Sequence, residues 1–188
     1  MELQGDRLIP APLDKTWAAL NDPETLKACI AGCESLERTG DDAFAAVVAV
    51  KVGPVSARFK GNLKMTNVQA PNSYTINFDG QGGVAGFGKG SADVALAPEG
   101  TSTRLKYTAK AQVGGKMAQV GSRLIDAAAS KVAEDFFKAF EEHLRPAEAA
   151  AAVVAEPAAV PAATGGNKTF WWVVGAAVVL LLIYLLMR

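Results

Sequence analysis

The chain has 188 residues, and its 19 lysines and arginines are matched by 19 aspartates and glutamates, so its formal net charge at pH 7 is zero. A chain of this length accommodates one domain with appendages. The same balance, 17 basic against 17 acidic residues, holds within residues 1–145, and it excludes the class of nucleic-acid-binding proteins, whose partner requires a basic surface.

The first predicted elements are a strand and two short helices. Residues 2–9 are typical of a strand, Pro12 precedes a short helix over 13–20 that carries Trp17, and Asp22-Pro23 is a helix-start signal for a second helix through Ala28. Six further strands follow, separated by turn signals such as Gly53-Pro54. Their predicted ranges are 34–38, 44–52, 55–67, 73–79, 88–96 and 104–113.

Apolar and polar residues alternate along the later strands, most regularly over residues 55–67. This period of two, with short connections, predicts an α+β domain built on a seven-stranded antiparallel sheet with one apolar face. Residues 116–144 contain no proline and have apolar residues at helical spacing, which predicts one long amphipathic helix across that face. The first half of this helix is rich in glycine and alanine, so the sheet and helix either enclose a hollow or pack tightly together.

The end of the chain differs from the rest. Residues 146–169 are rich in alanine and proline and are predicted to be a flexible linker. Residues 170–187 contain no charge and span about 27 Å as a helix, close to the ~30 Å apolar core of a bilayer. They predict one transmembrane helix. Because no signal peptide is recognisable at the N-terminus, we expect the domain on residues 1–145 to face the cytoplasm, held to the cytoplasmic membrane by a single-pass C-terminal anchor.

Three further features were candidates for chemistry. Cys29, Cys33 and His143 are too few and too far apart in the sequence for a metal site, so we expect no metal. The glycine run 80–90 follows a strand and opens another strand, which argues against a phosphate-binding loop and favours a hairpin loop that gates a cavity.

Bases on the outer sheet face form either an ordinary wet surface or a docking site for anionic lipid or an acidic partner. They are Arg58, Lys60, Lys64, Arg104, Lys106 and Lys110.

Several segments resemble the CoxG family of carbon monoxide dehydrogenase subunits, which belongs to the SRPBCC, or START-like, superfamily. They are Leu26-Lys27-Ala28-Cys29-Ile30-Ala31-Gly32-Cys33-Glu34, Val50-Lys51-Val52-Gly53-Pro54-Val55 with Phe59-Lys60-Gly61, the glycine turn 83–90, and the helix start 114–125. Ala31 stands where that family usually has proline. The resemblance covers residues 1 to about 144 and implies a helix-grip fold, a sheet wrapped around the long C-terminal helix, with an apolar cavity.

The resemblance also implies a role. CoxG-like proteins are accessory partners, not enzymes, of molybdenum-containing hydroxylases such as aerobic carbon monoxide dehydrogenase. A quinone-carrying role, with a non-covalent menaquinone or ubiquinone as the ligand, is attributed to them. We therefore expect the ligand-binding residues to line the cavity, with the Tyr107 hydroxyl or backbone donors near Gly32 and Cys33 at the polar end. The predicted set is Phe59, Leu63, Ile76, Phe78, Tyr107, Met117, Gly121, Leu124 and Ile125.

Two other functions compete with quinone carriage. One is a pure membrane recruiter that binds the dehydrogenase without a ligand. The other is a cyclase-like enzyme of the same superfamily, for which Tyr74 and Tyr107 are the only acid–base candidates on the inward strand faces. If the predicted set is right, Leu124→Trp fills the cavity and abolishes ligand uptake.

Overall fold

The computed structural model describes residues 1–145. The predicted linker over 146–169 and the predicted membrane helix over 170–187 lie outside the described residues. Within residues 1–145, no helix combines the length and the apolar character needed to cross a bilayer.

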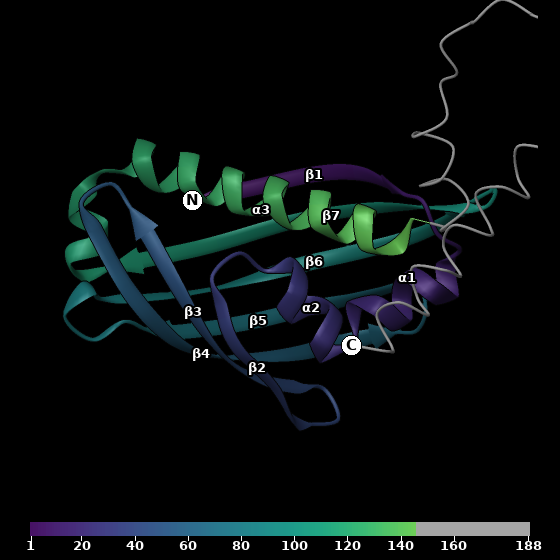
Figure 1. The fold of residues 1–188 in the computed structure, drawn as a ribbon, viewed down its shortest axis with the longest axis horizontal. Coiled ribbons are helices and arrows are strands. Elements are labelled where there is room, and N and C mark those ends of the chain that lie inside the picture. Colours follow the sequence, from purple (N-terminus) through teal and green to yellow (C-terminus); the bar gives the residue numbers. More distant parts are fainter. Residues whose placement is uncertain (146–188) are drawn as a thin grey trace, which may run out of the picture. The chain divides into compact units, whose positions relative to one another are not determined.

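The described chain forms one seven-stranded antiparallel sheet covered on one face by helices (Figure 1). The strand order is β1-β7-β6-β5-β4-β3-β2, so the first strand pairs with the last and every other pair is a neighbour in sequence. The elements are β1 Glu2–Ile9, α1 Leu13–Leu20, α2 Pro23–Cys29, β2 Cys33–Gly40, β3 Ala43–Val52, β4 Val55–Gln69, β5 Ser73–Gln81, η1 Gly83–Ala85, β6 Phe87–Glu99, β7 Ser102–Gly114, η2 Gly115–Val120 and α3 Ser122–Leu144. The predicted α+β fold, with its two short helices after the first strand, is confirmed.

The sheet presents one face to α3 and the other to solvent. Directly paired residues lie on the same face, so a row such as Phe78, Gly90 and Ala111 lies on the helix side. The next row, Asn77, Ser91 and Lys110, lies on the outer side. This is the alternation that the sequence shows along β4, where Leu63 is directly opposite Phe78.

The segment that follows β7 differs from the predicted single helix over 116–144. A 3-10 helix, η2, occupies residues 115–120, and the α-helix starts only at Ser122. Gly121 has φ +96° between them, a left-handed conformation that other residues rarely adopt. Met117 is buried on η2, ahead of the break, and therefore does not belong to the α-helix that covers the sheet.

The predicted loop over residues 80–90 is shorter than expected. Strand β5 runs to Gln81 and β6 begins at Phe87, which leaves only the turn around η1 between them. Gly90 belongs to the sheet, where it leaves room for the Phe78 ring: a Cβ atom at position 90 would lie 2.8 Å from Phe78 Cζ. The proposal that this loop gates a cavity stays a prediction.

The buried core gathers at one half of α3. Phe137 and Phe140 are its only buried side chains, and they pack with Ile9, Leu20 and Leu105. A second cluster, on β2 to β5, contains Leu36, Phe44, Ala46, Met65 and Tyr74. No residue of α3 before Phe137 is buried, so the helix packs most closely on the domain in its last two turns.

The start of α2 is capped as the Asp22-Pro23 signal predicts. Asp22 Oδ2 accepts hydrogen bonds from the Thr25 N–H at 2.9 Å and from the Thr25 hydroxyl at 2.6 Å. We expect Asp22→Ala to destabilise the domain by about 1 kcal/mol, because the cap is lost. Urea unfolding measures this change, and Asp22→Asn is the matched control, since an amide oxygen still accepts both bonds.

This capping contribution also depends on pH. The hydrogen bonds from the Thr25 side chain and then its backbone lower the pKa of Asp22 below its ordinary value of 3.8. The carboxylate's stabilisation is therefore complete above that value and is lost as the pH falls through the lowered folded-state pKa. The stability difference between the wild type and Asp22→Ala should shrink over this acid range. A constant difference down to about pH 2 would contradict this assignment.

Candidate functional site

An apolar cavity of about 450 Å³ lies between the inner face of the sheet and the helices. It is lined by Leu20, Leu26, Ile30, Leu36, Phe44, Leu63, Met65, Tyr74, Ile76, Phe78, Ala92, Val94, Leu105, Tyr107, Ala129, Val132, Ala133, Phe136 and Phe137. Its volume falls within the ~300–1,000 Å³ typical of small-molecule sites. Of the two alternatives that the sequence left open, a hollow or tight packing between sheet and helix, the structure has the hollow.

Side-chain size explains why the space stays open. Ala129 and Ala133 face the sheet from α3 where larger residues would reach it, and Ala92 opposes them on β6. One turn later, Phe136 and Phe137 close the cavity. Val132 lines the cavity and is also 48% exposed, so the cavity reaches the surface beside this residue.

Tyr74 and Tyr107 are the only residues in the cavity lining that carry a hydroxyl group, and the Tyr107 hydroxyl lies over Gly5 of β1. The Tyr107 ring stacks on Phe137 with ring centroids 5.1 Å apart, and Tyr74 makes an edge contact with Trp17 at 5.4 Å. Within residues 1–145, neither hydroxyl has a hydrogen-bond partner. Burial raises the pKa of Tyr74, so its hydroxyl stays protonated at physiological pH and is available as a donor.

The structure brings four of the nine predicted site residues together in the lining: Leu63, Ile76, Phe78 and Tyr107. Phe59 lies elsewhere, with its ring against Gly82, and Met117 is buried on η2. Gly121 forms the break before α3, Ile125 borders a separate hollow near Met1, and Leu124 is 49% exposed. These five positions are corrections to the predicted set.

Helix phase explains the error at Leu124. Residues spaced by four, such as 124, 128, 132 and 136, drift around a helix by about 40° per step. A stripe that faces the sheet at Phe136 has therefore turned toward the flank at Leu124. At that place, a Cβ atom added to Gly53 in the β3–β4 turn would lie 3.7 Å from Leu124 Cδ1. A tryptophan at position 124 would consequently not fill the cavity, so Leu124→Trp does not test ligand uptake.

The sequence prediction missed the wall formed by α2, β2 and β3. Leu26, Ile30, Leu36 and Phe44 line the cavity on this side. The signal was present, since Phe44 and Ala46 alternate with residues of the outer face and Leu26 and Ile30 are four residues apart. It did not reveal that α2 packs across the sheet edge.

The segment around the two cysteines is structural. Cys29 is buried and Cys33 half-buried, both are free, and burial raises the pKa of each thiol. The Cys33 N–H donates to the Ile30 carbonyl at 3.1 Å, so it is not available as the polar anchor that the sequence suggested. His143 is exposed and lies 3.4 Å from the Thr25 hydroxyl through Nε2. Residues 1–145 hold no group of three or more side chains suited to a metal ion.

Gly5 on β1 positions the Tyr107 ring. A Cβ atom at position 5 would lie 2.6 Å from Tyr107 Cζ and Oη. We expect Gly5→Ala to displace the ring from Phe137 and to cost about 1–3 kcal/mol, as overpacking does. Gly88→Ala is the matched control, because nothing lies within 4 Å of a Cβ atom there. Equal urea midpoints for the two variants would disprove this packing role.

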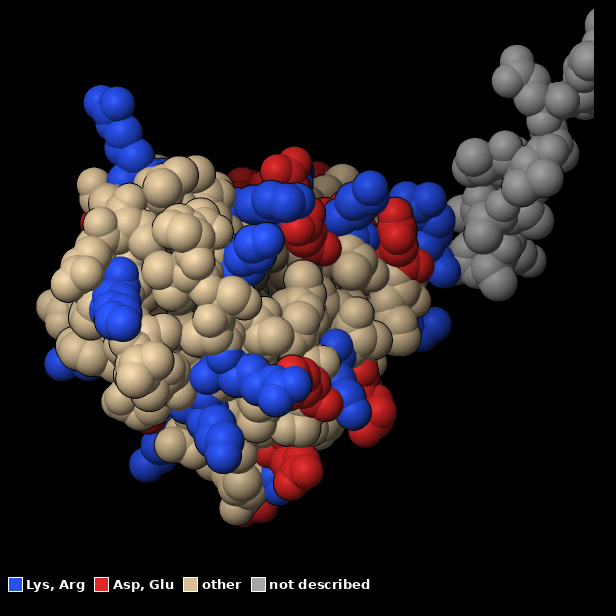
Figure 2. All heavy atoms as spheres, turned by 60° about the vertical axis from the view of Figure 1, so that its left-hand side comes forward, with Lys and Arg blue, Asp and Glu red and all other residues tan. Residues whose placement is uncertain are grey.

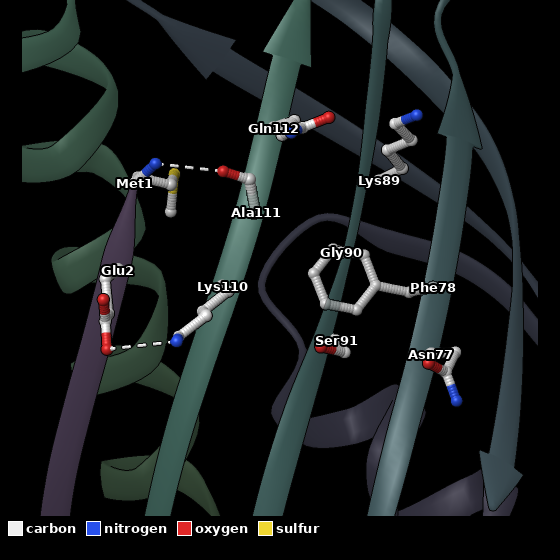
Figure 3. A pocket seen from close by; sticks show the side chains of 10 residues that line it. All are labelled: Met1, Glu2, Asn77, Phe78, Lys89, Gly90, Ser91, Lys110, Ala111 and Gln112. Atoms are coloured by element: carbon white, nitrogen blue, oxygen red, sulfur yellow. Dashed lines mark hydrogen bonds and ion pairs between the residues drawn. The ribbon is translucent and has the colours of Figure 1, made fainter.

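A second hollow, of about 820 Å³, is lined by Met1, Glu2 and residues of β5, β6 and β7 from both rows described above (Figure 3). Its polar side chains are Glu2, Asn77, Lys89, Ser91, Lys110 and Gln112. The Met1 amine donates to the Ala111 carbonyl at 3.0 Å, and Lys110 Nζ lies 3.9 Å from Glu2 Oε1. This open hollow therefore has partly polar walls, in contrast to the apolar cavity, and its Lys89 forms no ion pair within residues 1–145.

The bases predicted on the outer sheet face are mostly neutralised. Arg104 pairs with Glu99 at 2.8 Å and with Asp6 at 3.2 Å, and Arg58 pairs with Glu34 at 2.7 Å. Lys106 and Lys110 lie 3.9 Å from carboxylates of β1. Exposed pairs of this kind contribute little stability. For Arg104, Lys106 and Lys110 they favour the ordinary wet surface over a docking site, whereas Lys60 and Lys64 form no ion pair within residues 1–145.

The curved antiparallel sheet, the long C-terminal helix and the apolar cavity between them define a START-like, helix-grip domain. A START superfamily protein from Mycobacterium smegmatis is 16% identical over 76% of this chain and 96% of its own, with a TM-score of 0.57. The Zhui aromatase/cyclase from Streptomyces sp. R1128 is 13% identical over 77% and 93%, with a TM-score of 0.59. At these identities, both show the fold alone.

Residues 5–145 match the family model of the CoxG subunit of carbon monoxide dehydrogenase. The chain therefore belongs to the CoxG family. A conserved protein from Geobacillus kaustophilus is 30% identical, with a TM-score of 0.72, and the match covers 77% of this chain and 95% of that one. Among curated proteins, none matches the chain.

Proposed function

We propose that this protein carries a quinone in its apolar cavity and thereby links a carbon monoxide dehydrogenase-type molybdenum enzyme to the membrane quinone pool. The supporting observation is a cavity whose lining is apolar apart from two tyrosines, Tyr74 and Tyr107. An isoprenoid tail gains about 25 cal/mol per Å² when apolar walls bury it. The carbonyl oxygens of a quinone need only a few donors, which Tyr74 and Tyr107 provide.

The accessory role rests on the family. Its description names a subunit of carbon monoxide dehydrogenase, and we propose an enzyme of that type as the partner. In the proposed transfer, the partner's oxidation releases two electrons, and the quinone takes them up with two protons to become the quinol. The carrier itself needs no acid–base group for this purpose. Its cavity lining contains no carboxylate, imidazole or amine, which argues against a cyclase-like enzyme.

We further propose that residues 170–187 hold the carrier to the cytoplasmic membrane, with the domain on the cytoplasmic side. This part of the proposal rests on the uncharged, apolar sequence of the segment. The linker over 146–169 then lets the domain reach both the bilayer and a soluble partner.

A fragment of residues 1–145 is suitable for testing ligand binding. The matching region makes up 95% of the Geobacillus chain, so a relative folds with little beyond this domain. The fragment also retains a single tryptophan, Trp17, because Trp171 and Trp172 lie beyond it. Trp17 contacts Tyr74 in the cavity wall, so a bound quinone should quench its fluorescence.

The experiment titrates the fragment with menaquinone and with ubiquinone in dilute detergent and follows Trp17 fluorescence. We expect saturable quenching at one quinone per domain, and an organic extract of the purified fragment analysed by mass spectrometry should contain quinone. A linear, non-saturating response together with a quinone-free extract would overturn carriage. That result would favour a ligand-free membrane recruiter of the dehydrogenase.

A further inference from the structure

Charge is segregated between the two ends of the described domain. One end, here called the basic end, comprises residues 51–60 at the β3–β4 turn, 81–90 around η1, and 112–125 across η2 and the start of α3. These segments contain no acidic residue. Their basic residues are Lys51, Arg58, Lys60, Lys89, Lys116 and Arg123.

The opposite end has the reverse composition. Residues 10–28 around α1 and α2, 36–44 at the β2–β3 turn, and 97–103 at the β6–β7 turn make up this end. Within these three segments, three bases, Lys15, Lys27 and Arg38, stand against a larger acidic set, and the adjoining end of α3 adds bases and acids in equal number. The acidic residues are Asp14, Asp22, Glu24, Glu37, Asp41, Asp42 and Glu99. Overall neutrality therefore conceals a strong charge asymmetry along the domain.

The bases of the basic end are available to a partner. Arg58 pairs with Glu34, but within residues 1–145 the other five form no ion pair. Asp79 and Asp126 are the nearest acids along the chain, just outside the three segments. Figure 2 shows basic side chains across the whole view, whereas most of the acidic ones lie from its centre to its right side.

The basic end also exposes apolar side chains. Val84 at the tip of η1 is 85% exposed, and Phe87, whose ring lies over Gly114, is 39% exposed. Gly86 and Gly115 approach each other through their backbones, which holds the η1 turn against η2. An apolar tip that shares one end of the domain with unpaired bases is the composition of a surface that enters the headgroup region of an anionic bilayer.

An apolar stripe connects this end to the cavity. Leu124, Ala128 and Val132 are spaced by four on α3 and form neighbouring positions along one edge of the helix. Leu124 lies close to Gly53 of the β3–β4 turn, inside the basic end. Val132 lines the cavity and is half exposed. The stripe thus extends from the basic end to the cavity opening.

We propose that the basic end is the surface by which the domain docks on anionic lipid, with the η1 tip inserted and the Leu124–Val132 stripe leading from the bilayer to the cavity. The identity of the cargo on this route rests on the proposed function, but the docking does not. An acidic protein would pair with the bases without requiring an exposed valine at the same end of the domain, which is why the geometry points to lipid.

Flotation of the 1–145 fragment with quinone-free vesicles tests the docking. We expect binding to phosphatidylcholine vesicles that contain phosphatidylglycerol, little binding to pure phosphatidylcholine, and weakening at high salt. Lys89→Glu with Lys116→Glu should lower the affinity at least tenfold. Lys15→Glu with Lys27→Glu is the matched control, since it changes the net charge equally at the opposite end. Val84→Ser should reduce binding severalfold without changing the charge.

Circular dichroism first confirms that each variant is folded. Equal losses from the two charge-reversed pairs, or no flotation with anionic vesicles at all, would overturn the docking proposal. Saturable Trp17 quenching in detergent would in that case still support carriage. Conversely, flotation that depends on Lys89, Lys116 and Val84 supports the docking surface, even if the titration with quinone fails and the carrier function is rejected.

Discussion

Replacing Ala133 by Phe is expected to weaken quinone binding at least tenfold while leaving the domain folded. The alanine faces the cavity from α3, and a phenyl ring at this position would occupy the space that a ligand needs. Because the added side chain fills a hollow and buries apolar surface, the free energy of unfolding should stay unchanged or rise. Trp17 quenching measures the binding, and urea unfolding measures the stability.

The matched control is Ala127→Phe, the same substitution at an exposed position of the same helix. It should leave quinone binding within twofold of the wild type. Binding that is equally weak in both variants would mean that the effect comes from helix distortion. Undiminished binding in a folded Ala133→Phe domain would show that the ligand site lies outside this cavity.

Replacing Phe140 by Ala is expected to have the largest effect on stability, a loss of about 3–5 kcal/mol. Phe140 is fully buried, stacks on Phe136 at 5.6 Å, and joins α3 to the core around Ile9 and Leu105. Since a marginally stable domain has only about 5–15 kcal/mol in total, the variant should unfold at a much lower urea concentration.

Phe136→Ala provides the comparison for this prediction. Phe136 is only partly buried and borders the cavity, so its truncation removes fewer contacts and should cost less. If the two variants were equally stable, α3 would not be anchored at Phe140, and the assignment of the core to the second half of the helix would be wrong.

The sheet was predictable because strand faces obey a local rule. Along β4 and β5, the alternation of large apolar and polar residues assigns each side chain to a face with no knowledge of the neighbours. Leu63, Ile76, Phe78 and Tyr107 were therefore placed correctly on the inner face. Short turns such as Gly53-Pro54 then fixed the antiparallel order.

The helical half of the site was less predictable because it depends on tertiary geometry. The rotation of α3 about its axis is set by how Phe137 and Phe140 pack, and a four-residue pattern tolerates several rotations. The break at Gly121 shifted the start of the helix, so Met117 and Gly121 left the predicted lining. Leu26 and Ile30 were missed because only the folded chain brings α2 over the cavity.

Helix α3 is anchored to the core mainly near its C-terminal end. Phe137 and Phe140 anchor its end in the core, whereas residues 129–136 border the cavity and include no buried side chain. An apolar ligand in the cavity would give these turns a surface to pack against, and would stabilise them more as more of the protein is occupied. Ligand binding would thus order the part of α3 that borders the cavity. A partner protein that binds this part of the helix would distinguish the ligand-bound carrier from the empty one.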